Sequence, residues 1–126
     1  MNELRRIVHI ESGETIVERA RWCDTFASKL RGFTLRRELE PGEGLVLVER
    51  RESRLNTAIH MLFVFFNLGV LWVDEDGRVV DLVVAKPWRL SYTPQAPARY
   101  VVEGHPQLTS RVAVGDHVRF IKITGG

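Results

Sequence analysis

The sequence contains one cysteine in 126 residues, and this scarcity excludes several kinds of site. Cys23 cannot form a disulfide within the chain, and no metal site built from several cysteines is possible. A lone free thiol is typical of proteins in a reducing compartment. We therefore expect a cytoplasmic protein.

Long hydrophobic runs are also missing. The longest apolar stretch, residues 61–73, is interrupted by Asn67 and Gly69 and is shorter than the roughly 20 residues that a membrane helix needs. The first residues lead into an alternating segment, without the basic and apolar regions of a signal peptide. We expect no membrane partner.

Charge of one sign does not dominate any part of the chain. The net charge is +2, with 11 basic and 10 acidic side chains in residues 1–54 and 7 and 6 in the remainder. The arginines of residues 31–54 alternate with acids such as Glu38 and Glu52. This pattern favours a solvated, ion-paired surface, so we expect no nucleic-acid partner.

Motifs for metals, cofactors and nucleophilic catalysis are absent as well. The four histidines, His9, His60, His105 and His117, lack the spacing of zinc ligands. The chain has no glycine-rich phosphate loop and no serine in a nucleophile-elbow sequence. The sequence therefore predicts no metal and no cofactor.

The chain is rich in short apolar and alternating segments, which predict strands. They are residues 4–10, 15–20, 45–48, 59–66, 70–73, 79–84, 99–103 and 117–123, and a solvated loop is expected at residues 50–54. A short helix is expected after Asp24 or Thr25, with Phe26 and Leu30 on one face and Gly32 at its end. The sequence thus predicts a single, mainly β (α+β) domain over residues 1–126 with one short helix near the N-terminus. The expected core is Leu45, Leu47, Ile59, Leu62, Val64, Val70, Trp72, Val80 and Val101.

Several segments between residues 17 and 123 resemble one family. They are Lys29-Leu30-Arg31-Gly32-Phe33, Gly44-Leu45-Val46-Leu47, Ile59-His60-Met61-Leu62-Phe63, Asp74-Glu75-Asp76-Gly77-Arg78-Val79-Val80, Lys86-Pro87-Trp88-Arg89, Ala98-Arg99-Tyr100-Val101-Val102-Glu103 and Val114-Gly115-Asp116. In order and spacing they are similar to the family called domain of unknown function 192 (DUF192). The resemblance implies a small, compact, β-rich, barrel-like fold with a short helix near its start, and it implies no settled activity.

The central block departs from the family's pattern. Where such proteins usually carry a methionine, a basic residue, a proline and an aspartate, this chain has Val64, Phe65, Asn67 and Gly69. The departures remove one acidic and one basic group and leave the apolar face and His60. Any polar site shared by the family is expected to be weaker here.

Five residues are candidates for a ligand site: Asn56, Thr57, His60, Trp88 and Arg89. A neutral histidine in an apolar segment can act as a general base or bind a ligand, and it can equally be structural. Asn56 and Thr57 could orient its ring or form a turn. Trp88 and Arg89 offer a stacking face and a fork of donors for an anionic or planar ligand. The alternative is that Trp88 covers one end of the fold and Arg89 pairs with an acid.

Two further features have a functional and a plain interpretation. Cys23 precedes the expected helix, where a helix dipole can lower a thiol pKa, but a buried, inert cysteine is favoured. The chain ends in Gly125-Gly126, as diglycine carrier proteins do, although the rest of the chain lacks the shorter layout of such carriers.

These observations predict a binding domain, without deciding whether it is an enzyme. The first hypothesis is a non-enzymatic module for a small anionic ligand or a protein partner, because no complete catalytic constellation can be assembled. The second is a hydrolase or transferase that uses His60 with Arg89. The third is a diglycine-terminated carrier.

Overall fold

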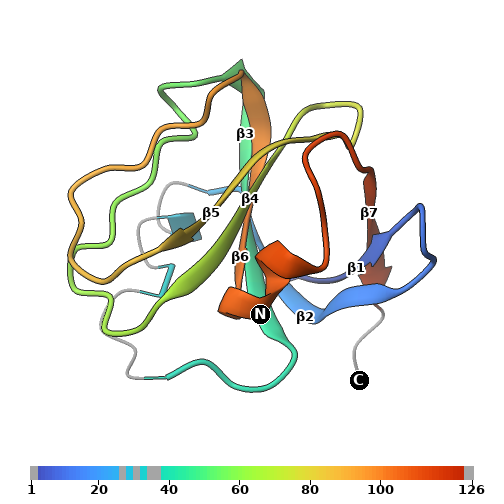
Figure 1. Cartoon of the computed structure of the whole chain (residues 1–126), viewed down its shortest axis with the longest axis horizontal. Helices are drawn as coiled ribbons and strands as arrows, with labels where there is room; N and C mark the ends of the chain where they lie inside the picture. Colours follow the sequence, from blue (N-terminus) through green and yellow to red (C-terminus); the bar gives the residue numbers. More distant parts are fainter. Residues whose placement is uncertain (1–2, 26–27, 30–31, 34–37, 124–126) are drawn as a thin grey trace.

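The protein forms one curved sheet of seven strands, seen here in a computed structural model that describes residues 3–25, 28–29, 32–33 and 38–123 (Figure 1). The strands follow the order β5-β4-β6-β3-β2-β1-β7 across the sheet. Their bounds are β1 Leu4–His9, β2 Thr15–Cys23, β3 Glu43–Ser53, β4 Leu68–Val73, β5 Val79–Ala85, β6 Ala98–Gly104 and β7 Val118–Ile123, with a 3-10 helix, η1, at Pro106–Ser110. The described residues contain no helix with the length and hydropathy needed to span a membrane.

The sheet curls so that its two edges approach each other. All neighbouring strands are antiparallel except β2 and β3, which pair in parallel over residues 19–23 and 43–47. At the start of β5, Val79 N donates to Asp116 O at 2.8 Å, and Gly115 N donates to Val79 O at 2.8 Å. These bonds join the edge strand β5 to the turn before β7. The result is a half-barrel, and the predicted mainly β class is confirmed.

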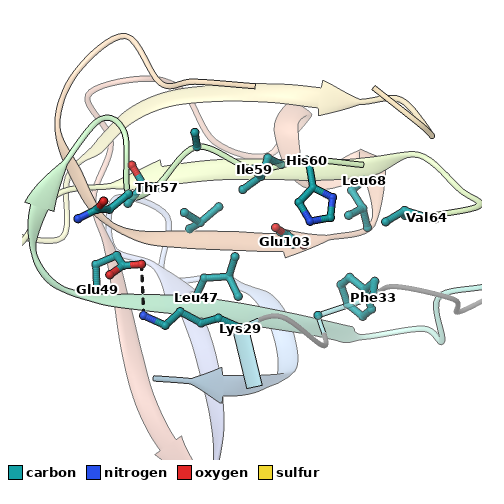
Figure 2. A pocket seen from close by; sticks show the side chains of 14 residues that line it. Lys29, Phe33, Leu47, Glu49, Thr57, Ile59, His60, Val64, Leu68 and Glu103 are labelled. Carbon is teal, nitrogen blue, oxygen red and sulfur yellow. Dashed lines mark ion pairs between the residues drawn. The ribbon is translucent and has the colours of Figure 1, made fainter. Parts of the chain in front are cut away.

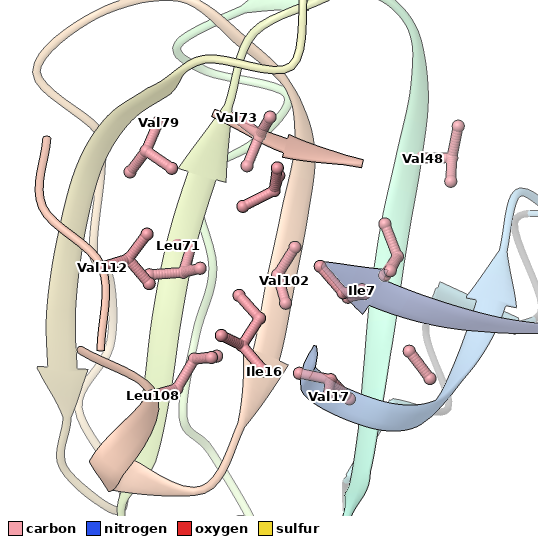
Figure 3. Packing of buried hydrophobic residues seen from close by; sticks show 13 residues of the cluster. Ile7, Ile16, Val17, Val48, Leu71, Val73, Val79, Val102, Leu108 and Val112 are labelled. Atoms are coloured by element: carbon pink, nitrogen blue, oxygen red, sulfur yellow. The ribbon is translucent and has the colours of Figure 1, made fainter. Parts of the chain in front are cut away.

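The two faces of the sheet carry separate hydrophobic clusters, because side chains alternate along each strand. The concave cluster is Ile7, Ile16, Val17, Ala20, Val46, Val48, Leu71, Val73, Val79, Val102, Leu108, Val112 and Val118 (Figure 3). The other face carries Cys23, Phe33, Leu45, Ile59, Met61, Val64, Leu68, Val70, Trp72, Ala85, Ala98 and Val101. The predicted core belongs to this second cluster: six of its nine members are buried there, while Leu47 and Val80 are partly buried against it and Leu62 is of intermediate exposure. The concave cluster was not predicted.

The predicted helix near the N-terminus is not confirmed. Among the described residues the only complete helical element is η1, and none reaches seven residues. Ser28 and Lys29 are helical, Lys29 N donates to Thr25 O, and Gly32 N donates to Ser28 O. Gly32 has φ 38°, the left-handed conformation in which helices commonly end. Phe26 and Leu30 lie outside the described residues.

The predicted strand over residues 59–66 is also wrong. Only Ile59 pairs, in an isolated bridge with Tyr92, and Val64 N donates to Met61 O in a turn. Phe63 at φ 61° breaks the extended backbone. This covering segment, residues 54–67, runs beside residues 86–97 on one side of the sheet (Figure 1), where Trp88 N donates to Met61 O at 2.7 Å. The loop predicted at residues 50–54 instead continues β3 as far as Ser53.

A polar latch, formed by His9, Glu11, Asp116 and His117, fastens the first hairpin to the turn before β7. His9 Nε2 lies 2.8 Å from Asp116 Oδ2, and His117 Nδ1 lies 2.8 Å from Glu11 Oε2. The hydrogen bond from the His117 ring, with a second from its backbone N–H, lowers the pKa of Glu11 to about 2. A hydrogen bond from Ala113 N, with His9 second, lowers the pKa of Asp116.

The latch should make the protein sensitive to acid. The pKa of Glu11 is lowered by folding, so its contribution is complete above its ordinary value of 4.5 and is lost as pH falls towards 2. We expect Glu11→Gln to lower the melting temperature at pH 6 and to flatten its decline between pH 5 and pH 2. The exposed Glu18→Gln serves as the control and should follow the wild type. Parallel pH profiles for wild type and Glu11→Gln would contradict this role.

Candidate functional site

A cavity of about 560 Å³ lies between the second face of the sheet and the covering segment (Figure 2). Its described lining combines an apolar wall with a few polar groups. The lining residues are Lys29, Gly32, Phe33, Leu47, Glu49, Asn56, Thr57, Ala58, Ile59, His60, Val64, Leu68, Val101 and Glu103. Its volume falls within the range of small-molecule sites, roughly 300–1,000 Å³.

The floor of the cavity follows from the strand register. Leu45 of β3 is paired with Arg21 of β2 on one side and with Glu103 of β6 on the other, and Val70 of β4 pairs with Glu103. Residues paired directly across strands share a face of the sheet. These side chains therefore form one row, and Glu103 stands in it between two fully buried aliphatic residues.

Glu103 is the one acidic residue among the buried side chains of the described chain, at 7% exposure. No hydrogen bond or ion pair formed by the described residues engages its carboxyl group. Desolvation by burial raises its pKa to about 7, against a smaller opposing effect of the Arg21 charge. Figure 2 shows the carboxyl group directed into the cavity beneath His60.

Arg21 approaches Glu103 without bonding to it. Its Nη2 donates to Gly32 O at 3.0 Å, and its guanidinium carbon lies 5.6 Å from the centre of the Phe33 ring. Its buried Nε finds no hydrogen-bond partner among the residues that the structure describes. Arg21 is absent from the described lining of the cavity, so its charge acts from the side while the carboxyl group of Glu103 stays accessible.

The rim carries the remaining polar groups. Lys29 Nζ lies 3.2 Å from Glu49 Oε1 and donates to Val48 O at 3.1 Å, so its charge is already paired (Figure 2). His60 is exposed, and Leu62 N donates to its Nδ1 at 3.2 Å. With Nδ1 acting as an acceptor, Nε2 carries the proton of a neutral ring and can be offered to a ligand.

The structure brings three of the five predicted site residues to this cavity. Asn56, Thr57 and His60 line it, whereas Trp88 and Arg89 are not among its described lining residues. Thr57 is 1% exposed, and its Oγ1 donates to Ser53 O. That bond favours the structural interpretation of Thr57, which shapes the start of the covering segment.

Trp88 and Arg89 form a separate exposed surface. Trp88 is 48% exposed at φ 68°, and its ring lies 5.0 Å from that of Phe63 and 5.7 Å from that of Phe65. The Arg89 guanidinium lies over the Tyr92 ring at 5.3 Å. The predicted convergence of His60 and Arg89 in one pocket is therefore not found among the described lining residues.

Trp72 fastens the covering segment to the sheet. It is 1% exposed, and its Nε1 donates to Thr57 O at 2.7 Å. We expect Trp72→Phe to destabilise the protein by about 1–3 kcal/mol, since it leaves the buried Thr57 carbonyl without its donor. Trp22→Phe is the control for ring size, because Trp22 contacts Tyr100 and Phe120 through its ring. Equal losses in denaturant unfolding would assign the effect to ring volume and not to the hydrogen bond.

Cys23 is fully buried beside this site and is not among the described residues that line the cavity. Burial raises the pKa of its thiol, and the nearby Arg21 charge opposes this only in part. A protonated, buried thiol is a poor nucleophile. The favoured interpretation of Cys23 as an inert core residue agrees with this environment.

One group in the described chain has the geometry to hold a metal ion. Ligand atoms of His9, Glu11 and Asp116 lie within 4.8 Å of one another, although Asp116 is far from the other two in sequence. Their direct contacts already form the polar latch, with His9 Nδ1 also 2.7 Å from Ser12 Oγ. The prediction that the protein needs no metal stays a prediction.

Glu103 is the site residue that the sequence pattern did not lead us to expect. It ends the apolar sequence Tyr100-Val101-Val102, in which alternation places residues 101 and 103 on the same face. That pattern puts a carboxyl group on a core-facing position, which is a usable signal of function because buried carboxylates are rare unless paired. The sequence could not show that the surrounding face would stay partly hollow.

Comparisons with known proteins settle the family. The profile of DUF192, described as "Uncharacterized ACR, COG1430", matches residues 7–120. The chain belongs to the DUF192 family. The UPF0127 protein TK1120 of Thermococcus kodakarensis is 38% identical over 87% of this chain and 69% of its own length. The UPF0127 protein PF1050 of Pyrococcus furiosus is 33% identical over 90% of this chain and 97% of its own.

A solved structure supports the same fold. A protein from Sinorhizobium meliloti 1021, named as a candidate transcription regulator, superimposes with a TM-score of 0.78, covering 95% of this chain and 94% of its own at 20% identity. At that identity the likeness shows the fold alone. The names of the UPF0127 relatives and the description of DUF192 specify no activity, so the function of this DUF192 domain rests on its own site.

Proposed function

We propose that this DUF192 domain, one unit over residues 1–126, binds a small molecule in the cavity beneath its covering segment. The observation that carries the proposal is the 560 Å³ cavity with its mainly apolar lining and few polar groups. Aliphatic and aromatic walls supply affinity for an apolar body, and isolated polar groups supply orientation. Leu47, Ile59, Val64 and Val101 form such walls.

The shape of the site favours binding over catalysis. Of the titratable groups in the described lining, Lys29 and Glu49 are paired with each other, and neither His60 nor Glu103 is paired with a nucleophile there. Acyl or group transfer would also need donors that stabilise a developing charge. A hydrolase or transferase would depend on the predicted pair, His60 and Arg89, and these two residues lie in different surroundings.

Two further functions draw on other parts of the molecule. An anionic ligand or a protein partner at Trp88 and Arg89 would use the exposed aromatic surface of Phe63, Phe65 and Trp88. A diglycine carrier would depend on Gly125 and Gly126, which lie outside the described residues. For each of these functions the cytoplasm is the compartment that we propose, supported by the free thiol of Cys23.

A blocked cavity tests the proposal. Leu47 is partly exposed on the cavity wall, and the larger side chain of Leu47→Trp would fill the space. A thermal-shift screen of small metabolites should give stabilising compounds for the wild type that fail with Leu47→Trp. The matched control is Leu82→Trp, because Leu82 is also partly exposed and is not among the described lining residues. Compounds that stabilise all three proteins equally would overturn the cavity as the binding site.

A further inference from the structure

We propose that the ligand of this cavity carries a cationic nitrogen, an ammonium or amidinium group, that pairs with Glu103. This inference rests on the proposed function and adds the class of ligand. It starts from the position of the carboxyl group, which is buried, directed into the cavity and unbonded by the described residues. A buried polar group without a hydrogen-bond partner destabilises the folded protein. A ligand that supplies the missing donor would remove this cost.

The residues beside Glu103 on the two neighbouring strands are aliphatic. Its register partners are Leu45 and Val70, and Val101, two residues earlier, faces the same way. Among the described residues nothing donates to this carboxyl group, so a donor from a ligand would be its first hydrogen-bond partner. In a site shielded from water, a charge-assisted hydrogen bond is stronger than a neutral one.

The remaining charged groups around the cavity leave this role to Glu103. From β3, Glu49 is paired with Lys29, and the pair is neutral as a unit. From β2, Arg21 donates a hydrogen bond from Nη2 to Gly32 O and is not among the described lining residues. From the covering segment, His60 uses Nδ1 as an acceptor. No unpaired cation of the described lining competes with a ligand ammonium for the carboxylate.

The protonation of Glu103 makes its pairing with a cation measurable through the pH dependence of binding. Because burial holds the Glu103 pKa near 7, the free site is partly protonated at neutral pH, and a cation selects the ionised form. Binding of an ammonium ion should release a proton and should weaken as pH falls below about 6. A protonated carboxyl group could instead donate to an anion or a carbonyl, which would give the opposite pH dependence.

Three probes of matched shape separate these possibilities: benzylamine, benzyl alcohol and benzoate. Binding is followed by chemical-shift titration of the wild type, Glu103→Gln and the control Glu18→Gln, an exposed glutamate that is not among the described lining residues, at about pH 8 and about pH 5.5, on either side of the raised pKa. We expect benzylamine to bind the wild type roughly tenfold more tightly than benzyl alcohol at the higher pH. This preference should disappear in Glu103→Gln, persist in Glu18→Gln and shrink at the lower pH.

Each contrary outcome has a distinct meaning. Benzyl alcohol or benzoate binding as well as benzylamine, with Leu47→Trp blocking all of them, would overturn the cationic ligand and leave the binding cavity standing. Benzylamine affinity that is unchanged in Glu103→Gln would also overturn the inference. Failure of all three probes, together with no stabilising compound in the screen, would overturn the proposed function itself. If Glu103→Gln does not fold, the pH dependence of the wild type decides alone.

Discussion

Glu103→Gln is expected to stabilise the protein above neutral pH, although it replaces a strand residue in the centre of the sheet. The pKa of Glu103 is raised from its ordinary value of 4.5 to about 7 by burial. Between these values the folded protein holds a proton that the unfolded chain has lost, so stability falls as pH rises. Glutamine has nearly the same shape and does not ionise. The free energy of unfolding of Glu103→Gln, relative to that of the wild type, should therefore rise by about 3 kcal/mol as the pH increases from about 4.5 to about 8.

The measurement is denaturant unfolding of both proteins at several pH values across that interval. The slope of the difference matters more than its absolute size, because repacking of the amide would shift the whole curve equally. The attraction to Arg21 acts on the ionised carboxylate alone and is already contained in the raised pKa. Glu49→Gln is the matched control, since Glu49 lines the same cavity but is paired with Lys29. A constant difference between Glu103→Gln and wild type across the interval would mean that Glu103 is not desolvated in the folded protein.

The strands were readable from the sequence because their signals are local. Alternation predicted β7, and the turn at residues 74–77 between apolar runs predicted the hairpin of β4 and β5. The residues expected in the core came from the most apolar segments, and those chosen lie on the second face, whereas Val46 and Leu71 of the same segments lie in the concave cluster. The concave face is built from residues such as Ile7, Ile16 and Val118, whose meeting depends on curling of the sheet. No local pattern encodes that long-range contact.

The covering segment shows a different limit. Its composition of aliphatic and aromatic residues favours a strand, yet it forms a turn at Met61 and a left-handed residue at Phe63. Tertiary bonds override propensity here, because Trp72 and the backbone of residues 88–92 hold the segment. Because the covering segment does not pair as a strand, it leaves a cavity between itself and the sheet. A cavity arises from this non-local packing. The sequence could therefore nominate His60 and could mark Glu103 as a core-facing carboxyl group, but it could not show that the two residues share a cavity.

The departure of this chain from its family at Gly69 has a steric cause. A Cβ atom built on Gly69 would clash with His105 O and would lie 3.1 Å from Leu108 Cβ. The carbonyl belongs to the backbone at the start of η1, so it cannot turn aside as a flexible side chain can. The backbone of this protein therefore has no room for the aspartate expected from the family pattern. Close packing of η1 on β4 takes the space that such a carboxylate would need.

Gly69→Ala should consequently destabilise the protein by about 3 kcal/mol, near the upper end of overpacking effects. Gly104→Ala is a matched control, because Gly104 is the register partner of Gly69 on β6 and neither glycine has a positive φ. A Cβ atom on Gly104 would have its nearest neighbour, Leu108 Cδ2, at an ordinary 3.5 Å. That variant should lose about 1 kcal/mol or less. Similar melting temperatures for the two variants would show that η1 can move away from β4, and the steric account of the family departure would then fail.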